Sequence, residues 1–256
     1  MLGNKKQKKT AVKFQYNNMI LKLIAFAFTC VGTYGIAILQ NSIMGIDSYS
    51  AQTLLAAFNA DAAVFGQATS VLLCSGVCAF SIPIYAKILI EGYKNTSSVK
   101  NYLIGILILA IASEIPYDLA IGASFFDMTS QNPAFGMVIA LVMLWIFKIF
   151  DEITGAKAVI LKLVIIASAM LWTFLLGVNY GPGFVLLVAV LWLLEGKGII
   201  TIIAGILASM VYFPAPIGFV FNHFYNGEKG DGKREWFYVL YPVHFLIFGI
   251  ISMYVL

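Results

Sequence analysis

Runs of apolar residues separated by short polar breaks occupy most of the chain, from Met19 to Leu256. A helix needs about 20 mostly apolar residues to cross a bilayer, and somewhat fewer where neighbouring helices shield its ends. The pattern therefore predicts an all-α fold, a polytopic bundle of transmembrane helices with about nine spans and a range of about seven to nine. The predicted spans are Met19–Leu39, Phe65–Ile90, Tyr102–Ala112, Phe135–Phe150, Val159–Leu176, Phe184–Leu194, Ile199–Val211, Ile217–Phe224 and Trp236–Leu256.

The loops between these runs differ in their basic residues, and cytoplasmic loops collect Lys and Arg. With the N-terminus in the cytoplasm, the loops 41–61, 114–133 and 177–183, which have no Lys or Arg, lie outside. The loops on the cytoplasmic side then hold Lys94, Lys100, Lys148, Lys157 and Lys197. The predicted location is the cell membrane, as a multi-pass protein with a cytoplasmic N-terminus.

The run Ile217–Phe224 is short for a crossing. If it crosses, the basic turn with Lys229, Lys233 and Arg234 also lies inside, and this favours nine spans. A re-entrant or interfacial placement of this run is the alternative.

Composition excludes an ordinary soluble domain. Only 11% of the residues are charged and 61% are hydrophobic, whereas a soluble domain carries about 25% charged residues. We expect residues 1–18 to form a basic cytoplasmic tail beside anionic lipid, and residues 19–256 to form a single transmembrane helical domain. The bilayer, and not nucleic acid, is the expected partner of this tail. No metal site is predicted, because the three cysteines fall within spans without His or carboxylate at ligand spacing.

His244 is the first candidate for chemistry. Counting from Trp236 at about 1.5 Å per residue places it roughly 12 Å deep in an apolar core of roughly 30 Å. Tyr241 lies three residues earlier, on the same helix face. A neutral imidazole there can act as a general base near neutral pH. The alternative is a packing histidine that is hydrogen-bonded to a neighbouring helix.

Three carboxylates are further candidates for catalysis. Glu91 lies four residues after Lys87 at the cytoplasmic end of the second span, where a simple ion pair within the helix is the alternative. Glu114 and Asp118 flank Pro116, which predicts a helix boundary at Ile115. Both acids then crowd a helix end, where burial and repulsion favour a protonated carboxyl. The alternative is a solvated helix end whose acids cap backbone N–H groups.

The basic turn Gly227–Arg234 spells a phosphate-loop pattern, except that Arg234 replaces the hydroxyl residue that would ligate magnesium. It also lacks the strand before and the helix after it. A flexible basic turn is the better interpretation. Lys229, Lys233 and Arg234 are nevertheless predicted to attract an anionic cofactor, because they lie on the side where the phosphates of a coenzyme arrive.

Four ordered blocks resemble the signature blocks of the TraX family. They are Ile90-Glu91-Gly92-Tyr93, Ala112-Ser113-Glu114-Ile115-Pro116-Tyr117-Asp118-Leu119-Ala120, Phe224-Tyr225-Asn226-Gly227 and Tyr241-Pro242-Val243-His244. Lys22-Leu23-Ile24-Ala25 and Pro83 match in register, so the similarity spans nearly the whole chain. That family is known for N-terminal acetylation of conjugative pilin and is similar to integral-membrane acyltransferases. The resemblance implies acetyl-CoA as a substrate and a peptide or pilin-like acceptor.

The chain departs from the family at three places. The family usually carries an Asp-His pair on its first span, where this chain has Gly32 and Thr33. Arginines usual in the family are replaced by Ala79 on the second span and by Gly105 on the third. If the first-span histidine is the acyl-transfer base of the family, the remaining candidate is His244, assisted by Glu91, Glu114, Asp118 or Tyr241.

Three functions are therefore open. The leading one is an acyltransferase that passes acetyl from acetyl-CoA to an amine or hydroxyl acceptor, with His244 as base, Tyr241 as an orienting donor and Glu91 as partner of the imidazole. The second is a non-catalytic relative that binds or escorts a peptide in the membrane, which the missing Asp-His pair favours. A secondary transporter ranks last, because the sequence shows no inverted repeat.

Overall fold

The structure is a computed structural model that describes residues 15–45, 49–228 and 235–254. These residues form helices and no β-strand. The α-helices are α1 Asn18–Tyr34, α2 Ala51–Ala60, α3 Ala62–Ala79, α4 Ser81–Asn95, α5 Val99–Ile121, α6 Ala134–Ile149, α7 Gly155–Leu175, α8 Gly181–Leu193, α9 Ile199–Ser209, α10 Gly218–His223 and α11 Glu235–Tyr254. A π-helical segment, Gly35–Ile43, continues α1, and 3-10 turns lie at Met210–Tyr212 and Ala215–Ile217.

Among the described residues, five helical segments are long and apolar enough to cross a membrane: Asn18–Ile43, Ala62–Asn95, Val99–Ile121, Gly155–Leu175 and Trp236–Tyr254. Three shorter apolar helices, Ala134–Ile149, Gly181–Leu193 and Ile199–Tyr212, accompany them. The all-α membrane bundle is thus confirmed, but the number of spans is lower than predicted. The reason is length: α8, with 13 residues, is about 20 Å long, less than an apolar core of about 30 Å.

The run Ile217–Phe224 is not among the described segments that are long and apolar enough to cross a membrane. Its helix, α10, has six residues and is about 9 Å long. The segment that follows α10 lies at the end of the bundle where α1 begins, as the hydrogen bond from the N–H of Asn226 to the carbonyl of Tyr16 at 3.0 Å shows. This short length favours the re-entrant or interfacial alternative, and the placement of the run relative to the membrane stays a prediction. The side on which the N-terminus lies stays a prediction, as does the division into residues 1–18 and 19–256.

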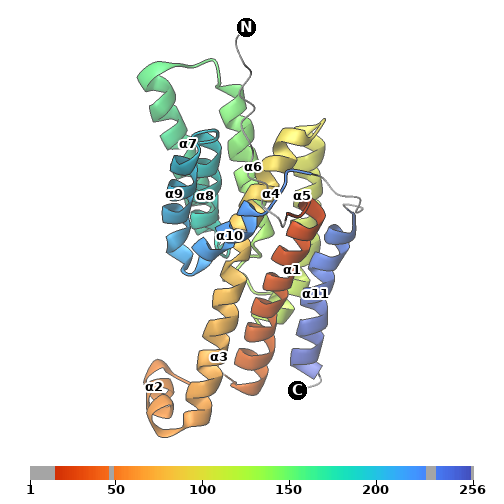
Figure 1. The fold of residues 1–256 in the computed structure, drawn as a ribbon. Helices are drawn as coiled ribbons and strands as arrows, with labels where there is room; N and C mark the ends of the chain where they lie inside the picture. Colours follow the sequence, from red (N-terminus) through yellow and green to blue (C-terminus); the bar gives the residue numbers. More distant parts are fainter. Residues whose placement is uncertain (1–14, 46–48, 229–234, 255–256) are drawn as a thin grey trace.

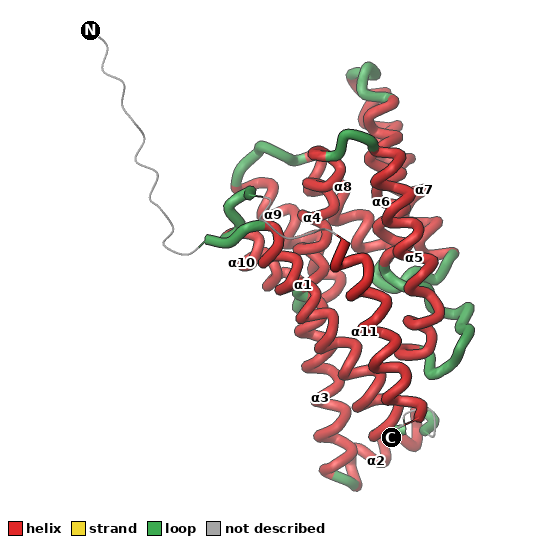
Figure 2. The backbone as a smooth tube through the Cα atoms, turned by 90° about the vertical axis from the view of Figure 1, so that its right-hand side faces the viewer, coloured by secondary structure: helices red, strands yellow, loops and turns green. Residues whose placement is uncertain are grey.

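The helices form an elongated bundle with two parts (Figure 1). In one part, α11 packs against α5, and α1 packs against α3 and α4. In the other part, α6, α7, α8 and α9 pack against one another, and α4 joins the two parts through its contacts with α8. Figure 2 shows the same arrangement from the side, with α2 at the end of the bundle where α11 finishes.

The main core cluster lies between α4, α6 and α8, where Ala86, Leu144 and Val188 have no exposed surface. The outer faces are apolar instead of polar. On α7, for example, Leu163 is 61% exposed and Phe174 72% exposed. Water disfavours such a surface whereas lipid does not, so these faces indicate a bilayer environment.

The helices α1 and α3 approach closely through glycine. A Cβ atom added at Gly32 would lie 2.4 Å from Cys78 Cβ, and one added at Gly35 would lie 2.5 Å from Cys74 Cβ. Both distances are shorter than side-chain contacts allow. α3 can therefore pack at this distance only because α1 and the π-helical segment that continues it have no side chain at these two positions.

This contact gives a stability prediction. We expect Gly32→Ala to destabilise the protein by about 1–3 kcal/mol, because the added methyl group overpacks the contact with Cys78. Gly66→Ala on α3 is the matched control, since nothing lies within 4 Å of a Cβ added there and alanine is the better helix former by about 1 kcal/mol. Thermal unfolding in detergent measures both. Equal midpoints for the two variants would contradict the close approach.

Candidate functional site

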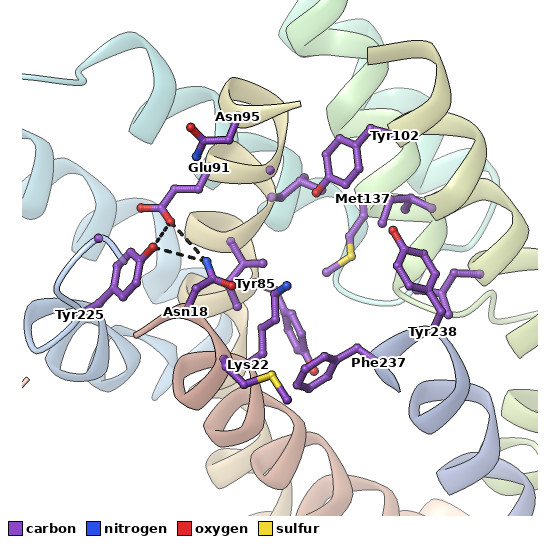
Figure 3. A pocket seen from close by; sticks show the side chains of 17 residues that line it. Asn18, Lys22, Tyr85, Glu91, Asn95, Tyr102, Met137, Tyr225, Phe237 and Tyr238 are labelled. Carbon is purple, nitrogen blue, oxygen red and sulfur yellow. Dashed lines mark hydrogen bonds between the residues drawn. The ribbon is translucent and has the colours of Figure 1, made fainter. Parts of the chain in front are cut away.

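A cavity of ≈ 440 Å³ lies at the end of the bundle where α1 begins and α4 ends. Its volume falls in the range of about 300–1,000 Å³ that small-molecule sites occupy. Figure 3 shows side chains from α1, α4, α5, α6, α11 and the segment after α10 converging on it. The lining residues are Asn18, Met19, Lys22, Tyr85, Ile88, Leu89, Glu91, Gly92, Asn95, Tyr102, Ile106, Leu109, Met137, Tyr225, Gly227, Phe237 and Tyr238.

Glu91 is the carboxylate among these lining residues, and it is firmly held. Its Oε2 accepts a hydrogen bond from the Tyr225 hydroxyl at 2.6 Å and from Asn18 Nδ2 at 3.4 Å. Its Oε1 lies 3.2 Å from Lys87 Nζ, so the predicted i,i+4 ion pair is present. The ion pair does not remove Glu91 from the cavity, because the side chain is 18% exposed and lines its wall.

Tyr225 donates to Glu91 over a wide pH range. Burial, together with the hydrogen bond to Glu91, raises the pKa of Tyr225 from 10.0 to about 12. The phenol therefore stays protonated at neutral pH. The stabilisation that it provides is complete below pH 10 and is lost as the pH rises through about 12.

A clasp between two distant segments brings Asn18 and Tyr225 to the same wall. The N–H of Tyr16 donates to the carbonyl of Phe224 at 3.1 Å, and the N–H of Asn18 donates to the carbonyl of Glu228 at 2.8 Å. The Tyr16 side chain is 5% exposed, and its hydroxyl donates to the carbonyl of Phe221. The clasp thus fixes residues 224–228 beside the start of α1.

Two glycines make room for tyrosine hydroxyls at the cavity. A Cβ atom at Gly92 would lie 2.4 Å from Tyr102 Oη, and one at Gly105 would lie 3.4 Å from Tyr238 Oη. Gly92 directly follows Glu91, so the absent side chain at this position lets Tyr102 lie next to the carboxylate wall. Lys22 reaches the cavity from α1, with its Nζ 5.6 Å from the centre of the Phe237 ring.

His244 is buried beside the cavity but does not line it. It is 5% exposed, and its Nε2 lies 3.3 Å from Thr33 Oγ1 and its Nδ1 3.4 Å from the carbonyl of Leu240. Its ring also packs against Phe245 at 3.9 Å between centroids. The expected pairing of His244 with Glu91 is therefore wrong for the described residues, because the two side chains have separate partners. Thr33 contacts His244 directly.

Tyr241 packs against His244, whereas Tyr85 lines the cavity. The Tyr241 ring packs against His244 and Phe245 at 5.5 and 5.2 Å, and it does not line the cavity. Tyr85 does line it, and its hydroxyl lies 3.2 Å from Thr29 Oγ1. Thr33 in turn donates to the carbonyl of Thr29. Polar groups of Tyr85, Thr29 and Thr33 thus follow one another from the cavity to His244.

Glu114 and Asp118 lie at the other end of α5 and hold the loop that follows it. Glu114 Oε2 accepts from the N–H of Asn132 at 3.2 Å and from its side-chain amide, and Asp118 Oδ2 accepts from the N–H of Asp127 at 3.1 Å. The capping alternative is thus present, but this end is not solvated, since Asp118 is 2% exposed. Neither acid lines the cavity.

The predicted helix boundary at Ile115 is wrong. Pro116 lies inside α5, which continues to Ile121. Proline removes one N–H donor from the helix, but packing of α5 against α11 and the hydrogen bonds of Glu114 and Asp118 hold the segment in place.

The predicted cofactor-binding residues Lys229, Lys233 and Arg234 lie outside the described residues. Glu228, which directly precedes them, is bonded to Asn18 at the cavity wall. The sequence reasoning did not select Asn18, Lys22 or Tyr225 as site residues. Tyr225 and Lys22 carried a signal, because both belong to the blocks that resemble TraX, whereas Asn18 carried none.

The fold and the cavity define an all-α membrane protein with a carboxylate site at one end of its bundle. Comparison with known families gives the particular family. The sequence matches the TraX protein family over residues 17–252, and the chain therefore belongs to the TraX family. No protein of curated function and no solved structure matches it.

Proposed function

We propose that this chain is a membrane acyltransferase. It takes an acyl group from acetyl-CoA and passes it to an amine or hydroxyl acceptor, such as a peptide N-terminus or a pilin-like protein. The observation that carries the proposal is the cavity beside Glu91, which combines a held carboxylate with room for a small molecule. Membership of the TraX family supports it.

The reaction needs a base near the acceptor. The amine nitrogen forms a bond to the thioester carbonyl carbon, the carbon–sulfur bond breaks, and the leaving thiolate takes up a proton. The attacking amine must lose a proton in this step. Glu91 is the best placed group to receive it, because its carboxylate lines the cavity and Tyr225 and Asn18 fix its orientation.

The proposed role of Lys229, Lys233 and Arg234 is to hold the phosphates of the coenzyme. Their place in the chain supports this role, because they follow Glu228, whose carbonyl accepts from the N–H of Asn18. Basic side chains that follow Glu228 in the sequence would attract an anionic coenzyme.

A second candidate is a non-catalytic relative that binds or escorts a peptide. One observation favours it: Thr33 occupies the position where the family usually has histidine, and His244 does not line the cavity. In this case the cavity would bind a peptide end without transferring an acyl group to it.

The test uses the full chain in lipid nanodiscs, with acetyl-CoA and a synthetic peptide that has a free N-terminus. Thiol release together with an acetyl mass gain on the peptide supports the acyltransferase. Saturable binding of the peptide without thiol release or mass gain supports the second candidate.

A separate variant tests whether His244 is the base. We expect His244→Ala to lower the transfer rate by less than about tenfold, below the roughly 10²–10⁴-fold effect of losing a general base. The reason is that Thr33 and Tyr85 lie between its imidazole and the cavity. A loss as large as that of Glu91→Gln would assign the base to His244 instead.

A further inference from the structure

The cavity wall has a polar end and an apolar end. In Figure 3, Glu91, Asn18 and Tyr225 lie together on one side, and Met137 lies opposite them, flanked by Tyr102 and Tyr238. Apolar residues of the lining come from α1, α4, α5, α6 and α11, and those on α4, α5 and α6 include Leu89, Ile106, Leu109 and Met137.

The apolar end is part of the protein core. Leu89 is 2% exposed and Ile106 is 7% exposed, and both belong to the main core cluster. Met137 packs against the same cluster, and its flexible thioether can adapt to the shape of an apolar ligand. This end therefore favours an apolar group.

The volume exceeds what an acetyl group needs. The cavity measures ≈ 440 Å³, whereas a water molecule has a share of about 30 Å³ in the liquid, and an acetyl group is only a few atoms larger. An acetyl group whose carbonyl carbon lies near Glu91 would leave the apolar end empty. Empty apolar volume loses the contacts that a chain of methylenes would make there.

We infer that the apolar end binds the acyl chain of the donor, so that the protein prefers acyl groups longer than acetyl. This inference rests on the proposed acyl transfer and names its donor class, a short-chain to medium-chain acyl thioester. The thioester carbonyl lies toward Glu91 and Tyr225, where the acceptor attacks. The chain extends past Tyr102 toward Ile106, Leu109 and Met137.

The glycine next to Glu91 keeps this path open. A side chain at Gly92 would displace Tyr102, because its Cβ would lie 2.4 Å from Tyr102 Oη. Gly92 thus keeps Tyr102 against α4, and the path toward the apolar end keeps its width.

The experiment measures chain-length preference in two ways. The full chain in nanodiscs receives acetyl-, butyryl-, hexanoyl- or octanoyl-CoA with one acceptor peptide, and mass spectrometry measures the acylated product. Binding of the matching non-hydrolysable thioether analogues is measured in parallel. We expect kcat/KM and affinity each to rise roughly fourfold for each methylene that becomes buried, until the apolar end is full.

Two variants on α5 separate the cavity from a general lipid effect. Leu109→Phe fills the apolar end and should shift the preferred chain to a shorter one. Ile108→Phe makes a similar change on the neighbouring residue, which is 61% exposed, and should leave the preference unchanged.

Each outcome decides one of the two proposals. Transfer of acetyl alone, with equal affinity for all analogues, overturns the inference and leaves the acyltransferase intact. A chain-length preference for analogue binding without any transfer supports the apolar site and contradicts the acyltransferase. A Leu109→Phe chain that changes its acceptor peptide preference but keeps its donor preference shows that the acceptor occupies this end, which also overturns the inference.

Discussion

A Glu91→Gln chain should lose acyl transfer by roughly 10²–10⁴-fold, the range of a lost general base. The amide has nearly the size of the carboxylate and still accepts the hydrogen bond from Tyr225, but it cannot take up the proton of the acceptor amine. Initial rates of thiol release with acetyl-CoA and an acceptor peptide measure the effect. The loss should appear in kcat, because the proton transfer belongs to the chemical step.

The control for this variant is Glu195→Gln. Glu195 pairs with Lys94 near the same end of the bundle, but it does not line the cavity. Its variant should keep the wild-type rate. A Glu91→Gln chain that folds and transfers acetyl at the wild-type rate would exclude Glu91 as the base.

Tyr225→Phe then distinguishes a base that Tyr225 positions from a simple ion pair. Loss of the 2.6 Å hydrogen bond should lower the transfer rate by less than Glu91→Gln does, because the carboxylate remains. If Glu91 served only as the partner of Lys87, Tyr225→Phe would leave the rate unchanged.

The apolar pattern predicted the helices well, because length and composition alone decide whether a segment can cross lipid. It failed where a run was short. In the run Ile217–Phe224, Phe221 and Phe224 pack against α1 and α4, whereas Ile217 and Val220 are exposed. Sequence alone cannot distinguish such a short packed segment from a crossing. The helix α2 was likewise missed, since Ala51–Ala60 fell within a loop predicted to lie outside the membrane.

The candidate site was predicted only in part from the sequence. Glu91 was selected because a carboxylate near a span end is unusual, and it does line the cavity. His244 was selected because it lies far from the span end at Trp236, and its side chain is indeed buried. His244 lies seven residues after Phe237, on the same face of α11 but about 10 Å further along its axis. Phe237 and Tyr238 therefore line the cavity, while His244 lies beyond it and contacts Thr33.

The acids of α5 illustrate how a structural role can resemble a catalytic one. Glu114 and Asp118 are ionisable residues within a span, which is the usual sign of function in a membrane protein. In this chain their hydrogen bonds hold the loop between α5 and α6. Asn132 is the centre of that arrangement, because it has no exposed surface and its side chain bonds to three groups.

Replacing Asn132 with alanine should therefore destabilise the protein by about 3 kcal/mol or more. Its amide donates to the carbonyl of Ala110 at 2.8 Å and to Glu114, and its Oδ1 accepts from the N–H of Ala134 at 2.9 Å. Alanine leaves these partners unsatisfied, at a cost of about 1–3 kcal/mol for each buried group. Thermal unfolding in detergent measures the change.

Gln131→Ala is the matched control, because the side-chain amide of Gln131 makes a longer hydrogen bond, 3.4 Å to the carbonyl of Asp127. Its unfolding midpoint should stay close to that of the wild type.

Glu114→Gln distinguishes a structural role of Glu114 from a catalytic one. If the role is structural, the variant should have a lower unfolding midpoint and normal acyl transfer at low temperature. Lost transfer with an unchanged midpoint would instead make Glu114 part of the chemistry, and an Asn132→Ala chain as stable as the wild type would contradict the structural role of this cluster.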